Sequence, residues 1–132
     1  MILGVGIDIV EVDRIKDTYE RFGSAFLKRG FTSREVDVAF RRNGLKRIET
    51  LASRFSAKEA FAKALGTGIG NNAFLREIEI QNDESGKPFI TVQGRTKETL
   101  ESLVPKGKKA KIHLSISDTK KLAETIVLIE AI

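Results

Sequence analysis

The chain has 132 residues and a formal net charge of +5, with no cysteine and a single histidine, His113. These counts exclude disulfides, thiolate metal sites and histidine-rich metal cages, so any bound metal should be a hard cation held by oxygen ligands. No apolar run is long enough to span a membrane and no signal-peptide pattern follows Met1, so we expect a cytoplasmic protein without a membrane partner.

The first half of the chain predicts one strand followed by three helices. The apolar, β-branched segment from Ile2 to Val12 is typical of a strand, and it carries Gly4, Gly6 and Asp8 on one face. Helices are expected over 13–22, from a capping pattern at Thr32 to about residue 40, and over 45–65.

The second half is expected to form two hairpins. Residues 74–81 and 89–93 alternate as strands around the turn-forming residues 82–88, and residues 110–117 and 122–129 flank a turn at 118–121. A short helix over 96–104 and a basic loop over 106–109 separate the hairpins. We therefore predict an α+β fold with a largely antiparallel sheet and a long helix packed against it, in a single domain over 1–132.

The most informative segment is RFSAKEAFAKAL over 54–65, a charged helix that runs directly into the glycine-rich sequence GTGIG over 66–70. Because the loop follows the helix, the positive end of the helix dipole does not face it, which excludes a Walker A or Rossmann site. Three glycines would still let backbone N–H groups approach a phosphate, with Lys58 and Lys63 adding charge. The alternative is a surface helix ended by a C-cap at Gly66.

Asp8 lies in the middle of an apolar strand, where burial of an unpaired carboxylate would be costly. Its partner could be an arginine or a backbone N–H. A less common alternative is a divalent cation shared with a second carboxylate such as Glu59.

His113, Ser115 and Ser117 share one face of the strand expected over 110–117, while the residues between them are apolar. This polar face is either the solvated side of the sheet or part of a site. No serine has a plausible His–Asp relay beside it, so nucleophilic hydrolysis is not favoured.

Three motifs in order resemble the holo-acyl-carrier-protein synthases, the small type of the phosphopantetheinyl transferase superfamily. They are GVGIDIVEVDRI over 4–15, RFSAKEA over 54–60 with Lys63 and the loop at 66–69, and HLSIS over 113–117. Their order and spacing match along nearly the whole chain, including the Gly86-Lys87-Pro88 turn. The resemblance implies a phosphopantetheinyl transferase-like fold. It also implies transfer of phosphopantetheine from coenzyme A to a serine of apo acyl carrier protein, releasing adenosine 3′,5′-bisphosphate, in fatty acid biosynthesis.

The resemblance also implies roles for individual residues. Asp8 and Glu59 match catalytic ligands of Mg²⁺, and Glu59 is the candidate for activating the serine hydroxyl. Arg14 matches the basic surface that docks the carrier protein, which we expect to extend through Arg21 and Lys28. The positions that contact the nucleotide and its phosphates correspond to Arg54, Lys63, Gly66, Gly68, Ile69 and His113. At Asp118 the chain departs from the family pattern, in which histidine is frequent.

The family forms trimers with each active site at a seam between two subunits, so the resemblance implies a homotrimer.

Two other functions are alternatives to this one. The segment from Arg14 to Lys63 has 13 basic and 6 acidic residues, a local charge of +7, which is typical of a nucleic-acid-binding module or of solvated helix faces. That module would leave Asp8 and Glu59 unexplained, so we expect no nucleic acid partner. The second is a related transferase acting on carrier domains of peptide or polyketide synthesis.

Overall fold

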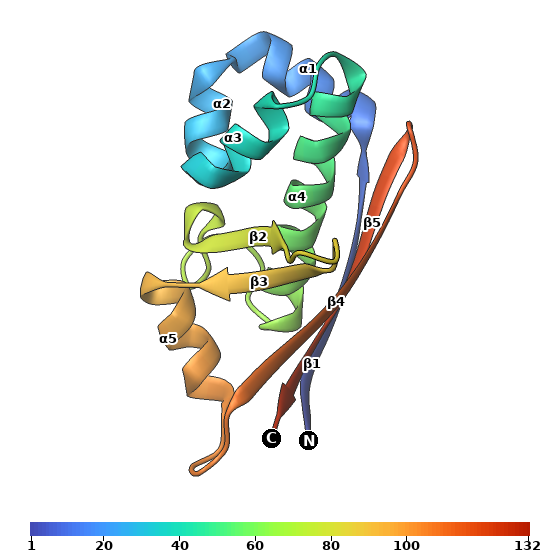
Figure 1. The fold of residues 1–132 in the computed structure, drawn as a ribbon. Helices are drawn as coiled ribbons and strands as arrows, with labels where there is room; N and C mark the ends of the chain where they lie inside the picture. Colours follow the sequence, from blue (N-terminus) through green and yellow to red (C-terminus); the bar gives the residue numbers. More distant parts are fainter.

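A long helix, α4, packs between a three-stranded sheet and a smaller hairpin in the computed structural model, which describes residues 1–132 (Figure 1). In chain order the elements are β1 (Ile2–Glu11), α1 (Val12–Phe22), α2 (Ser24–Gly30), α3 (Ser33–Phe40), α4 (Leu45–Ala64), the 3₁₀ turn η1 (Leu75–Glu77), β2 (Ile78–Asn82), β3 (Pro88–Val92), α5 (Gly94–Leu103), β4 (Ala110–Asp118) and β5 (Leu122–Ala131). The predicted α+β fold is confirmed. None of these helices has the length and hydrophobicity needed to cross a membrane.

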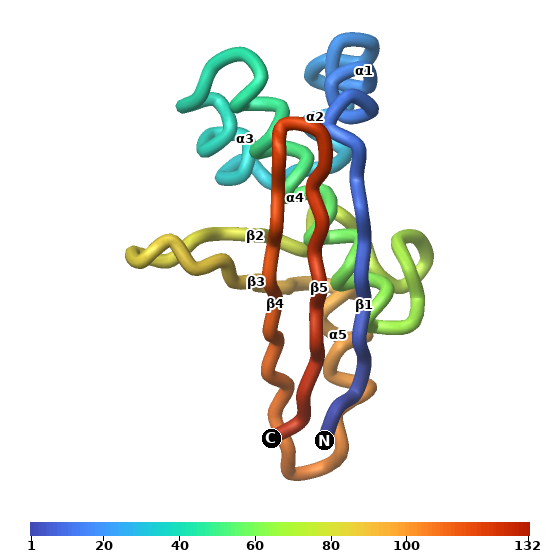
Figure 2. The backbone as a smooth tube through the Cα atoms, turned by 90° about the vertical axis from the view of Figure 1, so that its right-hand side faces the viewer, coloured from blue at the N-terminus to red at the C-terminus, as the bar shows by residue number.

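The three-stranded sheet has the order β1-β5-β4, and both pairs of strands are antiparallel. The N-terminal strand therefore pairs with the C-terminal one, with Gly6 opposite Val127 and Asp8 opposite Thr125. Figure 2 looks onto the outer face of this sheet, the face directed away from α4, and no other element of the chain lies in front of it. The two ends of the chain lie side by side at one end of the sheet (Figure 2).

Two glycines of β1 allow α4 to lie directly on the strand. A Cβ atom added to Gly4 would lie 1.9 Å from the backbone oxygen of Ala64, and one added to Gly6 would lie 2.0 Å from that of Ala60. Neither glycine has a positive φ, so the requirement is for space and not for an unusual backbone conformation. Asp8 is the next residue on this face of β1, so the contact also determines which residues of α4 lie near Asp8.

A buried ion pair holds the opposite side of α4. Lys58 has a side chain that is 0% exposed, and its Nζ lies 2.5 Å from Glu35 Oε1. The same ammonium donates hydrogen bonds to the backbone oxygens of Gly30 at 2.9 Å and Leu75 at 2.8 Å, so all three of its donors have partners. Burial lowers the pKa of Lys58, and the Glu35 carboxylate opposes that shift. The expectation that Lys58 contributes charge to a phosphate site is therefore wrong.

The Glu35 carboxylate extends this network across the fold. It accepts hydrogen bonds from the N–H of Thr32 at 2.9 Å and from the N–H of Ile80 at 2.8 Å. The first bond completes the capping box that begins α3, as the sequence pattern at Thr32 predicted. Together the two buried side chains connect α2, α3, η1 and β2 to α4.

Two local predictions were wrong. The strand expected over 74–81 begins only at Ile78, because residues 75–77 form η1. In this turn the backbone oxygen of Leu75 accepts a hydrogen bond from Lys58. The Glu77 carboxylate accepts hydrogen bonds from the N–H groups of Arg95 and Thr96, so α5 begins at Gly94 instead of residue 96. These bonds lower the pKa of Glu77. Helix α2 was not predicted, because Gly23 before it offers no side-chain cap and seven residues show little periodicity.

Replacing Gly6 by alanine should disrupt the contact between β1 and α4, because the methyl group would overlap the Ala60 carbonyl. We expect a loss of about 1–3 kcal/mol in the free energy of unfolding, typical of overpacking. Urea denaturation followed by circular dichroism measures it. The matched control is Gly30→Ala in α2, where the nearest atom to an added Cβ is Phe26 Cε1 at 3.8 Å and little change is expected. Equal stability of the two variants would contradict the proposed tight contact.

Candidate active site

Asp8, Glu59 and Lys63 meet where β1 lies across α4. Lys63 Nζ donates to Asp8 Oδ1 at 3.0 Å and to the backbone oxygen of Ile7 at 3.1 Å. The Asp8 side chain is 14% exposed, whereas that of Lys63 is 52% exposed. Glu59 precedes Lys63 by four positions and therefore lies on the same side of the helix.

A buried serine of α4, Ser56, hydrogen-bonds to the backbone of Asp8. Ser56 Oγ lies 3.2 Å from the backbone oxygen of Asp8 and 3.0 Å from Thr125 Oγ1, and it hydrogen-bonds to both residues. Because Thr125 is the partner of Asp8 in the sheet register, this hydroxyl joins α4 to β1 and β5 at one level. The candidate site therefore lies where hydrogen bonds join α4 to β1 and β5.

Glu59 lies close enough to Asp8 for the two charges to interact. Its carboxyl group is half-buried, and this burial raises its pKa. The negative charge of Asp8 raises the pKa further, while the ammonium of Lys63 lowers it. Two carboxylates that repel each other in a partly desolvated place favour binding of a positive ion between them.

These residues fit Mg²⁺ as it is commonly bound at phosphate sites. Carboxylate oxygens are hard ligands, and Mg²⁺ usually binds one or two of them while water and substrate phosphates complete its octahedron. The chain has no group of three or more His, Cys, Asp or Glu side chains placed to hold a metal. The donor set thus suits a cation shared with a phosphorylated substrate better than one enclosed by protein.

The glycine-rich loop folds back onto the end of α4. The N–H groups of Gly66 and Gly68 donate to the backbone oxygens of Lys63 and Ala62, and the N–H of Gly70 donates to Ala73. The glycine amides are therefore occupied, and they are not available to a phosphate. The alternative of a surface helix ended by a C-cap at Gly66 is also wrong, because most of α4 is buried and its C-cap is Leu65. The N–H groups of Thr67 and Ile69 make no hydrogen bond within the chain, so the loop still offers donors.

Arg54 also lies on α4, but five positions before Glu59, or about 140° around the helix axis. It lines a cavity of about 380 Å³ together with Arg42, Lys46 and Asp118. Arg54 is only 7% exposed and makes no hydrogen bond or ion pair within the chain, and burial lowers its pKa. The lining also includes the carboxylate of Glu49, and no guanidinium nitrogen of Arg54 is both buried and unpaired. An accessible guanidinium without a protein partner is suited to binding an anion.

Sequence reasoning missed two of these basic residues. Arg42 and Lys46 come from the run RRNGLKR over 41–47, whose charge density was the available signal. Asp118 lies at the end of β4, and its Oδ2 accepts a hydrogen bond of 2.6 Å from Ser53 Oγ. The Asp118 carboxylate therefore connects the tip of the β4–β5 hairpin to α4.

His113 does not join Asp8 within one chain. His113 of β4 pairs with Leu128 of β5, and Leu128 pairs on its other side with Val5 of β1. Residues paired in this way share one face of the sheet, so His113 lies with Val5 on the outer face. Asp8 lies on the opposite face, toward α4. His113 Nε2 is 2.9 Å from Glu130 Oε1, and this hydrogen bond lowers the pKa of Glu130.

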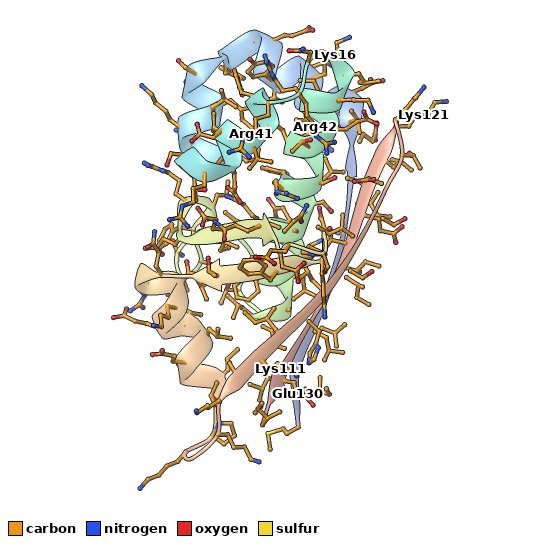
Figure 3. The ribbon with its side chains drawn as sticks, viewed as in Figure 1. Lys16, Arg41, Arg42, Lys111, Lys121 and Glu130 are labelled. Atoms are coloured by element: carbon orange, nitrogen blue, oxygen red, sulfur yellow. The ribbon has the colours of Figure 1, made fainter.

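The docking candidates Arg14, Arg21 and Lys28 are exposed on α1 and α2. Figure 3 labels three further basic residues, Lys16, Arg41 and Arg42, at this helical end of the molecule. Lys28 also lines a cavity of about 590 Å³ that includes Ile69, so the structure brings a docking candidate and the glycine-rich loop to the same place.

Comparison with known proteins identifies the family of the chain. Residues 4–117 match the family model of the 4′-phosphopantetheinyl transferase superfamily. The holo-[acyl-carrier-protein] synthase of Paramagnetospirillum magneticum is 43% identical over 131 residues, covering 99% of this chain and 98% of that protein. The corresponding protein of Methylorubrum populi is 42% identical, covering 100% of this chain and 96% of its own length.

Solved structures lead to the same family. The crystal structure of holo-[acyl-carrier-protein] synthase from Neisseria meningitidis has a TM-score of 0.85 at 37% identity, covering 98% of this chain and 99% of that one. The Bacillus anthracis synthase in complex with CoA (3′,5′-ADP) has a TM-score of 0.80 at 36% identity, covering 98% and 96%. The chain therefore belongs to the holo-[acyl-carrier-protein] synthase family within the 4′-phosphopantetheinyl transferase superfamily.

Proposed function

We propose that this chain transfers the phosphopantetheine moiety of coenzyme A to a serine hydroxyl of apo acyl carrier protein, in support of fatty acid biosynthesis. The serine oxygen forms a bond to the phosphorus that carries pantetheine. The bond from that phosphorus to the bridging oxygen breaks, and adenosine 3′,5′-bisphosphate leaves. Beyond the family itself, the observation that carries this proposal is the meeting of Asp8, Glu59 and Lys63 where β1 lies across α4.

Asp8 and Glu59 are the residues that would hold Mg²⁺, which when bound neutralises the charge of the pyrophosphate. Lys63 supplies a further positive charge to the same group, and the free N–H groups of Thr67 and Ile69 can bind phosphate oxygens. Glu59 accepts the proton of the attacking serine hydroxyl, because it lies close to Asp8, where the metal and the reacting phosphate would be held. Such a reaction depends mainly on positioning and charge neutralisation, which these residues provide.

The nucleotide end of coenzyme A carries phosphates that require basic partners. The cavity beside Arg54 offers three cationic side chains, from Arg42, Lys46 and Arg54, against two carboxylates, from Glu49 and Asp118. Gly86 and Pro88 of the turn noted in the sequence form part of its wall. A guanidinium without a protein partner can form charge-assisted hydrogen bonds to such an anion. We assign this cavity to the nucleotide phosphates.

We further propose a homotrimer with active sites at the seams between subunits. Val5, Ile7 and Ile9 are 56%, 52% and 59% exposed on the outer face of the sheet, beside exposed Leu122 and Ile126. A contiguous apolar face of this kind is typical of an interface. A neighbouring copy on this face would also bring His113 to a second subunit's site, which it does not reach in its own. The core consists of two clusters of buried apolar residues, and each includes residues of α4, which supports the single domain predicted over 1–132.

The direct experiment is incubation of the protein with coenzyme A, Mg²⁺ and an apo acyl carrier protein, followed by intact mass measurement of the carrier. The expected result is a gain of one phosphopantetheine group, and a carrier with its acceptor serine replaced by alanine should show none. Parallel reactions with carrier domains of peptide or polyketide synthesis test the alternative substrate class. No gain on any carrier would contradict the proposed function.

Asp8→Asn and Glu59→Gln should each lower kcat/KM by about 100-fold or more, because each replaces a charged oxygen ligand by a neutral group of similar shape. Steady-state transfer assays measure this loss, with circular dichroism to confirm folding. The matched control is Glu98→Gln, which changes an exposed carboxylate on α5 in the same way. Near-normal activity of either site variant at ordinary Mg²⁺ concentration would remove that carboxylate from the site.

Arg14→Glu should raise KM for the carrier protein about tenfold while leaving KM for coenzyme A nearly unchanged. Acyl carrier proteins are acidic, and a complementary charge at the rim speeds encounter and sets orientation. Higher ionic strength should raise the wild-type KM for the carrier and affect the variant less. Lys97→Glu on α5 serves as the control for a change of the same charge elsewhere. Equal losses for both substrates would exclude Arg14 from the docking surface.

Ile126→Glu should dissociate the assembly, because it places a charge at the centre of the apolar outer face. Sedimentation equilibrium should give a trimer for the wild type and a smaller species for the variant, with a parallel loss of transfer. Phe89→Ser changes an exposed apolar residue of β3 outside this face and should leave the trimer intact. A wild-type monomer with full activity would contradict the proposal of shared sites.

A further inference from the structure

Lys63 is the sole hydrogen-bonding partner that the chain offers to the Asp8 carboxylate. Its Nζ lies 3.0 Å from Asp8 Oδ1 and also donates to the backbone oxygen of Ile7. Asp8 is largely buried and needs a neutralising partner, and the ammonium supplies it. The same oxygen is one that a bound divalent cation would use, so the two positive groups compete for Asp8.

Lys63 is also less constrained than Lys58, the lysine on the opposite side of α4. Lys58 is fully buried with all three donors used, whereas Lys63 is half-exposed with one donor unpaired. Its flexible stem begins three residues before the glycine-rich loop, where Thr67 and Ile69 keep unpaired N–H groups. A short swing of the ammonium away from Asp8 therefore leads toward groups suited to a phosphate.

We infer that Lys63 is an exchangeable counter-ion, which neutralises Asp8 until a divalent cation replaces it there and then transfers its charge to the substrate pyrophosphate. This inference rests on the proposed function. The ion pair must be broken before the cation gains full access to Asp8, so it weakens cation binding in the free protein. The pyrophosphate removes that obstacle by accepting the ammonium. Cation and coenzyme A then strengthen each other's binding, beyond any direct contact between them.

The test is the affinity for Mn²⁺, measured by electron paramagnetic resonance of the free ion, for the full-length protein with and without coenzyme A. Lys63→Met keeps the stem and removes the charge. It should bind Mn²⁺ about 5-fold more tightly than the wild type when coenzyme A is absent, the lower end of typical coupling between ligands. Coenzyme A itself should bind the variant less tightly, and its enhancement of Mn²⁺ binding should shrink.

Three variants separate the possible outcomes. Lys63→Arg keeps the ion pair and should retain weak Mn²⁺ binding. Lys16→Met removes a distant positive charge and measures the general electrostatic effect, which should be small. Asp8→Asn should abolish the binding. Mn²⁺ binding that Asp8→Asn leaves unchanged would overturn both the metal assignment and this inference.

Asp8-dependent binding of equal strength in wild type and Lys63→Met would overturn the inference alone and leave the proposed function standing. A crystal structure with Mn²⁺ and coenzyme A gives an independent readout. Lys63 Nζ should then lie beyond hydrogen-bonding distance of Asp8 Oδ1 and beside a phosphate oxygen. Retention of the Lys63–Asp8 hydrogen bond beside bound Mn²⁺ would contradict the exchange.

Discussion

The direct contact between β1 and α4 is the constraint on which the rest of the structure depends. With hydrogen atoms alone at Gly4 and Gly6, the helix backbone reaches the strand and leaves no room for another arrangement. The next residue on the same strand face is Asp8, which therefore meets the side of α4 that carries Glu59 and Lys63. A chemically demanding cluster is thus placed by a contact that involves no functional group at all.

Helix α4 presents a different kind of surface in each direction. Small residues face β1, the buried Lys58 faces the other helices and η1, and Arg54 faces the cavity that Arg42 and Lys46 also line. This explains why the helix contains charged residues along its length although much of it is buried. Each buried charge either has a complete set of partners, as Lys58 does, or lines a cavity in which a ligand can supply them, as Arg54 does.

The sequence predicted most elements because local patterns determine them: alternation in the strands, the capping box at Thr32 and the turn residues at 82–88. It also brought Asp8 and Glu59 together as a hypothesis, since a carboxylate in an apolar strand requires a partner. It did not reveal that Lys58 is buried, because its partner Glu35 and the carbonyls of Gly30 and Leu75 are distant in sequence. The sequence also did not reveal η1, because long-range hydrogen bonds there override strand propensity. Nor did it reveal that His113 and Asp8 lie on opposite faces of the sheet, because this depends on the register of the strands.

Pairing of the first strand with the last has a topological consequence. The N–H of Ala131 donates to the backbone oxygen of Met1 at 2.8 Å, so the first and last residues lie next to each other (Figure 2). A short peptide joining the two ends would leave the sheet unchanged, and the chain could then be opened at the exposed turn between β2 and β3. The order in which the segments are synthesised is therefore separable from the architecture, which depends on how the strands lie side by side and not on which of them comes first.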